Sequence, residues 1–160
     1  MQATECTSCA IMQPYFFPYL AYFQLVDAVN TFVIYDDVNY INGGWIHRNN
    51  ILSHGGSQRI VLNLSGSSQN KLINEIEIFG ESKKILKTIS QNYSKAPNFE
   101  ATFSFFENLI SKANGNLATY LEYGIREICR TLGIDSKIID WTSEEMASEK
   151  LFTALLIASW

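Results

Sequence analysis

The sequence has little clustered positive charge and no stretch long enough to span a membrane. Its 160 residues include 12 lysines and arginines against 16 acidic residues, which gives a net charge of -4. Because affinity for a phosphate backbone depends on clustered cations, we expect no nucleic-acid partner. No run reaches the roughly 18 apolar residues that a membrane span needs, and the start MQATECTSCA does not resemble a secretory signal. We therefore expect a cytoplasmic protein without a membrane span.

Several familiar catalytic and metal-binding patterns are also missing. The chain contains no GxSxG, Walker loop, GxGxxG or HExxH motif, and its two histidines have no second partner at metal-ligand spacing. Cys6 and Cys9 form a CxxC, but only the distant Cys129 remains as a further thiol. The sequence therefore predicts no metal site and offers no evident nucleophile.

What remains is the composition of a folded globular protein. The hydrophobic share is 47% and the charged share is 18%, unlike those of a disordered chain. A length of 160 residues suits one domain and is short for two. We expect a single domain over residues 1–160.

Apolar patterning predicts alternating strands and helices in the first part of the chain. Thr7 to Gln13 indicates a buried strand, and Tyr19 to about Val29 indicates a buried helix that opens after Pro18. Thr31 to Asp36 (TFVIYD) is β-branched and aromatic, which favours a second strand. Such a unit has a right-handed crossover and parallel strands.

The middle of the chain predicts a hairpin and one more strand. Asn49–Ser53 and Gln58–Leu64 flank the glycine turn His54-Gly55-Gly56-Ser57. Leu72 to Ile78 (LINEIEI) alternates as a strand with one solvent-exposed face does.

The period then becomes helical. We expect a helix from Glu81 to a break at Pro97, a second over Asn98–Lys112 and a third over Asn116–Leu132 that is closed by Gly133. A late strand follows over Ser136–Trp141.

The end of the chain has two expected features. Thr142 and Glu145 form a capping box for a terminal helix. The last ten residues, LFTALLIASW, are almost wholly apolar, and a helix with so much apolar surface needs a covering layer. We expect this segment to pack into the core or to mediate oligomer formation.

An ordered set of motifs resembles the WbqC-like family of bacterial proteins. The set comprises IMQPYFFPYLAYFQL, FVIYDDVNYI, GWIHRN, NKLINEIEI and QNYSKAP, and it spans about Ala10 to Leu156. The resemblance implies a bacterial protein linked to O-antigen or other surface-polysaccharide synthesis. Relatives usually continue beyond this C-terminus, so the chain resembles a family member that lacks the C-terminal part. Ala21, His47 and Asn50 depart from the residues common in the family.

A weaker resemblance concerns architecture. The strand, proline-containing loop and helix around Tyr19 and Tyr22 resemble the HxGH region of nucleotidylyltransferases and of pantoate-β-alanine ligase, with tyrosines in place of both histidines. We therefore expect a three-layer, Rossmann-like α/β fold with a largely parallel sheet, an inserted β-hairpin and a C-terminal helical segment. It would be distantly related to the nucleotidylyltransferase-type fold.

Open α/β sheets bind ligands beyond the carboxyl ends of their strands. Gln13, Asp36 and Asp37 follow the first two strands, and the helix that begins at Tyr19 points its free N–H groups toward the same crevice. We favour Asp36 as the catalytic carboxylate, orienting a hydroxyl or a metal, and Asp37 as a loop-capping residue, although the reverse is also open.

Residues of the glycine loop complete the expected site. Arg48 is the best-placed cation for clamping a phosphate or carboxylate, so we assign it a catalytic role beside Asp36. The aromatic residues Tyr40 and Trp45 are the preferred stacking surfaces for a sugar or base. The expected ligand-binding residues are Gln13, Tyr15, Tyr19, Asp37, Tyr40, Trp45 and Asn49.

Two classes of function fit these residues. One is a transferase or ligase that attaches an acyl or aminoacyl group to an activated amino sugar. The other is a non-catalytic module that binds a nucleotide-sugar or a partner enzyme in the same pathway. Both imply a small, phosphate-containing substrate, and the cofactor remains open between ATP and a nucleotide-sugar with Mg²⁺.

Overall fold

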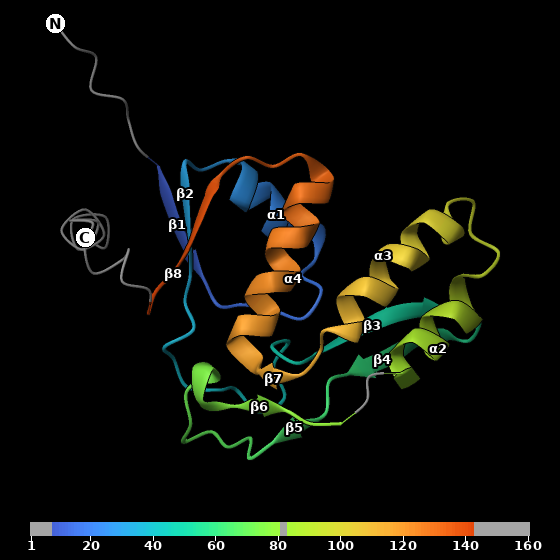
Figure 1. Cartoon of the computed structure of the whole chain (residues 1–160), viewed down its shortest axis with the longest axis horizontal. Helices are drawn as coiled ribbons and strands as arrows, with labels where there is room; N and C mark the ends of the chain where they lie inside the picture. Colours follow the sequence, from blue (N-terminus) through green and yellow to red (C-terminus); the bar gives the residue numbers. More distant parts are fainter. Residues whose placement is uncertain (1–7, 81–82, 143–160) are drawn as a thin grey trace, which may run out of the picture.

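The computed structural model describes residues 8–80 and 83–142. At one side of the molecule lies a three-stranded parallel sheet of order β1-β2-β8, built from β1 (Cys9–Met12), β2 (Thr31–Ile34) and β8 (Lys137–Asp140) (Figure 1). The predicted parallel pairing of the first two strands is confirmed, and the predicted late strand joins β2 on its other side. Both of the first two strands are shorter than predicted, since β1 ends at Met12 and β2 ends at Ile34.

The central strand β2 is buried along its whole length, as a strand between two neighbours should be. Phe32 and Ile34 pack against α1 (Leu20–Asp27) and α4 (Leu117–Leu132) on one face of the sheet. Val33 alternates to the other face, where it contacts Ile139. The chain thus has a mixed α/β fold with a parallel sheet and helices.

The predicted hairpin is confirmed as β3 (Arg48–Ser53) and β4 (Gly56–Val61). Its turn is tighter than expected, because Ser53 pairs with Gly56 and leaves only two residues in the loop. Gly56 has a φ of 121°, a backbone conformation that favours glycine. The hairpin lies with α2 (Lys83–Tyr93) and α3 (Phe99–Ser111) at the end of the molecule away from the parallel sheet (Figure 1).

The strand predicted over Leu72–Ile78 is wrong for most of its length. Ile73–Glu75 forms a 3₁₀ turn, η1, and only Glu77–Ile78 is a strand, β6. The Leu72 amide donates to the Glu75 carboxylate over 2.8 Å, which closes the turn. Ile73 and Ile76 are both fully buried, so the apolar spacing is three residues rather than two. β6 pairs with β5 (Leu64–Ser65) and β7 (Gly115–Asn116), two short strands that the sequence did not predict.

The longest helix has the predicted ends. The Asn116 side chain accepts from the Thr119 amide at the start of α4, and Gly133 closes the helix in the left-handed conformation. The terminal helix expected after Thr142 lies outside the described residues. Across residues 8–80 and 83–142, no helix combines the length and the apolar character of a membrane span.

Candidate functional site

A buried aspartate lies just beyond the carboxyl end of the central strand. Asp36 follows β2 by two residues and is only 6% exposed. Its Oδ2 accepts a hydrogen bond of 2.9 Å from the Thr142 hydroxyl, which lies just beyond β8. Its Oδ1 is buried without a hydrogen-bond partner among the described residues. A buried carboxylate oxygen without a partner is costly, so this atom is a candidate ligand-binding group.

A second carboxyl group lies next to it on β8. Asp140 pairs in register with Ile34, which places it on the same face of the sheet as Asp36. The pKa of Asp140 is raised to about 7, mainly by burial and then by the charge of Glu122 and a side-chain hydrogen bond with Glu122. The Arg126 guanidinium acts in the opposite direction, and Asp36 adds a smaller rise. Asp140 can therefore gain or lose a proton near neutral pH.

The helix α4 supplies the remaining charged groups. Glu122 and Arg126 are one turn apart and form an ion pair. We refer to Asp36, Glu122, Asp140, Arg126 and Thr142 together as the carboxylate cluster. Its carboxyl groups are not arranged as a set of three or more metal ligands, and the described residues contain no such set elsewhere. The cluster can hold an amine or a hydroxyl and can exchange a proton with it.

The side chains of the two predicted aspartates, Asp36 and Asp37, point in different directions, as those of adjacent residues in an extended chain do. Asp36 is buried in the carboxylate cluster, whereas Asp37 is exposed. Gln13 follows β1 in the row of Cys9 and Ile11, which pack on the opposite face of the sheet. No described hydrogen bond joins Gln13 to Asp36, and the Gln13 carbonyl accepts from the Tyr22 hydroxyl over 3.2 Å.

The segment after β1 leaves the sheet and binds the hairpin. The Phe16 amide donates to the Ile46 carbonyl over 3.0 Å, and the Asn49 side-chain amide donates to the carbonyls of Phe16 and Phe17. Phe17 has a φ of 52°, which is rare for a residue with a bulky side chain. The Asn49 side chain therefore stabilises an unfavourable backbone conformation at Phe17.

Arg48, Tyr40 and Trp45, the other predicted residues in and around the glycine loop, differ in their contacts and exposure. Arg48 donates from Nε to the Gly44 carbonyl over 2.9 Å and from Nη2 to the Gly43 carbonyl, so its guanidinium braces its own loop. Tyr40 is 2% exposed, and its hydroxyl bonds to His47 Nδ1 at 2.7 Å, which leaves no ring face open for stacking. Trp45 is 52% exposed and is open to a ligand.

Burial and the neighbouring Arg48 lower the pKa of His47. The imidazole is therefore neutral at pH 7, and it lies outside the carboxylate cluster. It serves here as the hydrogen-bond partner of Tyr40.

Tyr15 and Tyr19, both in the segment IMQPYFFPYLAYFQL, differ in exposure. Tyr15 is half-buried and packs edge-on against Tyr22, with ring centroids 5.9 Å apart. Tyr19 precedes α1 and is 66% exposed, and its side chain makes no capping hydrogen bond. The first turn of α1 is thus open to solvent at Tyr19 and Leu20.

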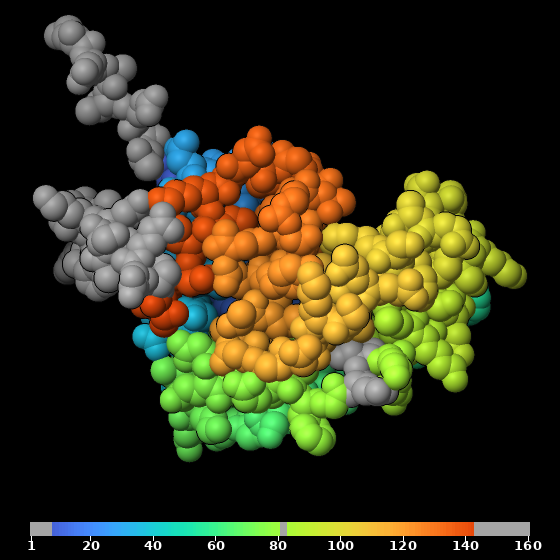
Figure 2. Space-filling model, viewed as in Figure 1, coloured from blue at the N-terminus to red at the C-terminus, as the bar shows by residue number. Residues whose placement is uncertain are grey.

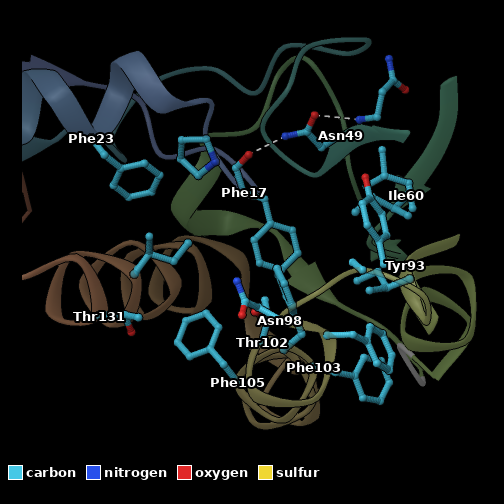
Figure 3. A pocket seen from close by; sticks show the side chains of 18 of the residues that line it. Phe17, Phe23, Asn49, Ile60, Tyr93, Asn98, Thr102, Phe103, Phe105 and Thr131 are labelled. Carbon is cyan, nitrogen blue, oxygen red and sulfur yellow. Dashed lines mark hydrogen bonds between the residues drawn. The ribbon is translucent and has the colours of Figure 1, made fainter. Parts of the chain in front are cut away.

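A large cavity opens on the other side of α4. It has a volume of about 680 Å³ and lies between the hairpin, α2, α3 and the ends of α1 and α4 (Figure 3). Phe17, Pro18 and Asn49 line it, and of these only Asn49 is among the predicted ligand-binding residues. We refer to this space as the apolar cavity. Figure 2 shows α3 projecting away from α4, with an indentation between them.

The carboxylate cluster and the apolar cavity are separate sites. With about 3.6 residues per turn, Ile128 and Thr131 project from α4 roughly opposite to Glu122 and Arg126. The structure therefore separates two of the predicted residues, with Asp36 in the carboxylate cluster and Asn49 at the apolar cavity.

The prediction missed most of the cluster. Asp140 ends the apolar run SKIID as Asp36 ends TFVIYD, and that parallel was the available signal. Nothing local distinguishes Glu122, because a charged residue on a long helix usually faces solvent.

Comparison with known proteins is consistent with the motifs. The chain is 28% identical over 145 residues to a protein of Mycobacterium tuberculosis named Uncharacterized protein Rv1507c. The alignment covers 88% of this chain and 63% of that protein, so the chain spans less than two thirds of its relative. No solved structure matches the chain. The model of the WbqC-like protein family matches residues 13–158, and the chain therefore belongs to the WbqC-like family.

Proposed function

We propose that this protein is a transferase or ligase that modifies an activated amino sugar in bacterial surface-polysaccharide biosynthesis. The observation that supports the proposal most directly is the carboxylate cluster at the carboxyl ends of parallel strands, where α/β enzymes place their chemistry. Membership of the WbqC-like family supports the glycan context. The proposal includes a three-layer, Rossmann-like domain over residues 1–160, distantly related to the nucleotidylyltransferase-type fold.

In the proposed reaction the cluster binds the amino group of the sugar. Asp36 Oδ1 lacks a partner among the described residues and would accept a hydrogen bond from the ammonium. Asp140, with a pKa near 7, takes one proton from it. The free amine then attacks the carbonyl carbon of an activated acyl or aminoacyl donor. A C–N bond forms, the donor's leaving group departs with the electron pair of the broken bond, and the second proton that the nitrogen loses goes to that leaving group.

Three of the other predicted site residues, Tyr19, Asp37 and Trp45, are exposed, and they would contact the sugar or its nucleotide. Arg48 would have to leave the carbonyls of Gly43 and Gly44 in order to clamp a phosphate. ATP, or a nucleotide-sugar with Mg²⁺, remains the proposed co-substrate.

The test is direct assay of the purified 160-residue protein. Nucleotide-activated amino sugars would be incubated with ATP and amino acids or with acyl thioesters, and products would be detected by mass spectrometry. We expect Asp140→Asn to reduce kcat by about a hundredfold or more, because a general base contributes at least that much. Asp135→Asn, at an exposed aspartate that precedes β8 and has no assigned role, is the matched control and should stay within about twofold.

The pH profile separates proton transfer from a structural role. If Asp140 is the base, kcat/KM of the wild type rises with pH and levels off above about 7, the pKa of this carboxyl group. Equal losses in Asp140→Asn and Asp135→Asn, or no product with any sugar, would refute the proposal.

A non-catalytic binding module is the second candidate, and one observation favours it. The Arg48 guanidinium is engaged by the carbonyls of its own loop. Thermal-shift measurements distinguish the two, since a ligand that binds the folded state raises the melting temperature whether or not it reacts. Stabilisation by nucleotide-sugars without turnover would support the binding module.

A further inference from the structure

The apolar cavity has the dimensions of a small-molecule site. Its volume of about 680 Å³ lies within the roughly 300–1,000 Å³ that is usual for ligand pockets. Its walls come from five elements that are distant in the sequence, and Phe17, Phe23, Phe103 and Phe105 point toward the space (Figure 3).

The chemistry of the walls restricts the ligand. Among the described residues that line the cavity, none carries a charged side chain. A phosphate or a carboxylate in this space would lose its hydration without gaining an ionic partner. The cavity is therefore unsuited to a nucleotide or a nucleotide-sugar, and an uncharged ligand fits it.

The polar groups in the walls indicate where such a ligand would be anchored. Asn98 and Thr102 are one helical turn apart at the start of α3, and neither side chain hydrogen-bonds to a described residue. By contrast, the Tyr93 hydroxyl accepts from the Leu52 amide, and the Thr131 hydroxyl donates to the Glu127 carbonyl. An amide and a hydroxyl side by side can bind one carbonyl group, with apolar walls beyond it.

The wall at Phe17 is built before any ligand binds. The positive φ of Phe17 costs free energy, and the Asn49 amide holds the carbonyls of Phe16 and Phe17 in place. Phe17 packs edge-on against Phe106 of α3, with centroids 5.1 Å apart. The segment IMQPYFFPYLAYFQL therefore forms a fixed side of the cavity, so less conformational entropy is lost when a ligand binds.

We infer that the apolar cavity binds a neutral acyl group, an aliphatic chain that carries an ester or amide carbonyl. The chain lies against the phenylalanine walls, and the carbonyl accepts hydrogen bonds from the Asn98 amide and the Thr102 hydroxyl. The inference does not rest on the proposed reaction, because the cavity and the carboxylate cluster lie on opposite sides of α4.

The experiment uses the 160-residue protein and the neutral dye Nile red, whose fluorescence rises in apolar surroundings. Methyl esters of saturated fatty acids from octanoic to palmitic acid compete for the dye, and uridine diphosphate is the charged competitor. We expect saturable dye binding, displacement by the esters and none by the diphosphate. Displacement by the diphosphate, or dye binding that the esters leave unchanged, overturns the inference.

Matched variants locate the site. Thr102→Trp fills the cavity from an exposed position, and Ser104→Trp places the same side chain on the opposite side of α3. We expect Thr102→Trp to weaken dye and ester binding at least about tenfold, and Ser104→Trp to leave both within about twofold. Equal effects of the two variants contradict the assignment.

Thr102→Val keeps the shape and removes the hydroxyl. It should weaken the binding of the methyl esters by about fivefold, because one hydrogen bond is lost, and it should leave the binding of alkanes of the same length unchanged. Ester binding that is unchanged in Thr102→Val overturns the role of the hydroxyl as the carbonyl anchor. Melting curves of each variant confirm that it folds.

Discussion

The two sides of α4 differ in chemistry. On one side, Glu122 and Arg126 meet Asp36 and Asp140 at the end of a closely packed parallel sheet. On the other side, the apolar cavity is walled by phenylalanines without a charged residue among those described. The first side can exchange protons, and the second can exclude water from an apolar group. One helix therefore separates a site suited to reaction from a site suited to binding.

The largest expected difference between the two sides is in the free energy lost when a large side chain is truncated to alanine. Ile34 is fully buried in the sheet, so Ile34→Ala should lower the free energy of unfolding by about 3–4 kcal/mol. Phe103 already faces empty space, so Phe103→Ala should cost only about 1 kcal/mol. Urea unfolding of both variants measures the difference. Similar losses would show that the walls of the cavity are packed as closely as the sheet.

The next effect concerns the strained wall of the cavity. Asn49→Ala removes the donors to the carbonyls of Phe16 and Phe17 and should lower the free energy of unfolding by about 2 kcal/mol. Asn50→Ala, at an exposed neighbouring position on the same hairpin, should change it by less than about 0.5 kcal/mol. Urea unfolding at constant pH gives both values. An Asn49→Ala protein as stable as the wild type would contradict the proposed clamp.

The charged side should respond to pH. The pKa of Asp140 is raised from 3.8 to about 7 in the folded protein, so ionisation of this group opposes folding. Its contribution to stability is full below about pH 4 and is lost as the pH rises through about 7. Asp140→Asn should match the wild type near pH 4 and exceed it above pH 7 by roughly 1–2 kcal/mol, a value discounted because the group is partly solvated. Denaturant unfolding at several pH values tests this, and a gap that does not widen with pH would contradict it.

The smallest effect is expected within α4 itself. The Tyr120 hydroxyl is buried without a hydrogen-bond partner among the described residues, so Tyr120→Phe should be neutral or stabilising by up to about 1 kcal/mol. Tyr40→Phe is the contrast, because it removes the hydrogen bond to His47 and should cost about 1 kcal/mol. Thermal unfolding in parallel measures both. A large loss in Tyr120→Phe would reveal a partner for this hydroxyl.

Much of the fold was predictable because its signals are local. The runs TFVIYD and SKIIDW predicted the strands β2 and β8, and the glycine turn at Gly55 and Gly56 predicted the hairpin. Gly133 gave the end of α4, because a left-handed residue stops a helix wherever the helix lies. The strand predicted at Leu72–Ile78 is wrong because the hydrogen bond that the Leu72 amide donates to the Glu75 carboxylate favours a 3₁₀ turn over an extended chain.

The amino-acid sequence by itself determined the family, the order of the main elements and the position of Asp36 after a buried strand. Only the tertiary structure decided which groups meet. Asp36 and Thr142 are 106 residues apart in the chain, and Arg48 finds its partners in its own loop instead of at the sheet. Local patterns record the period of burial along one segment, whereas the pKa of Asp140 and the walls of the apolar cavity depend on several segments packed together. Hydrogen bonds and burial between distant residues act only after the chain has folded, so no single segment carries them.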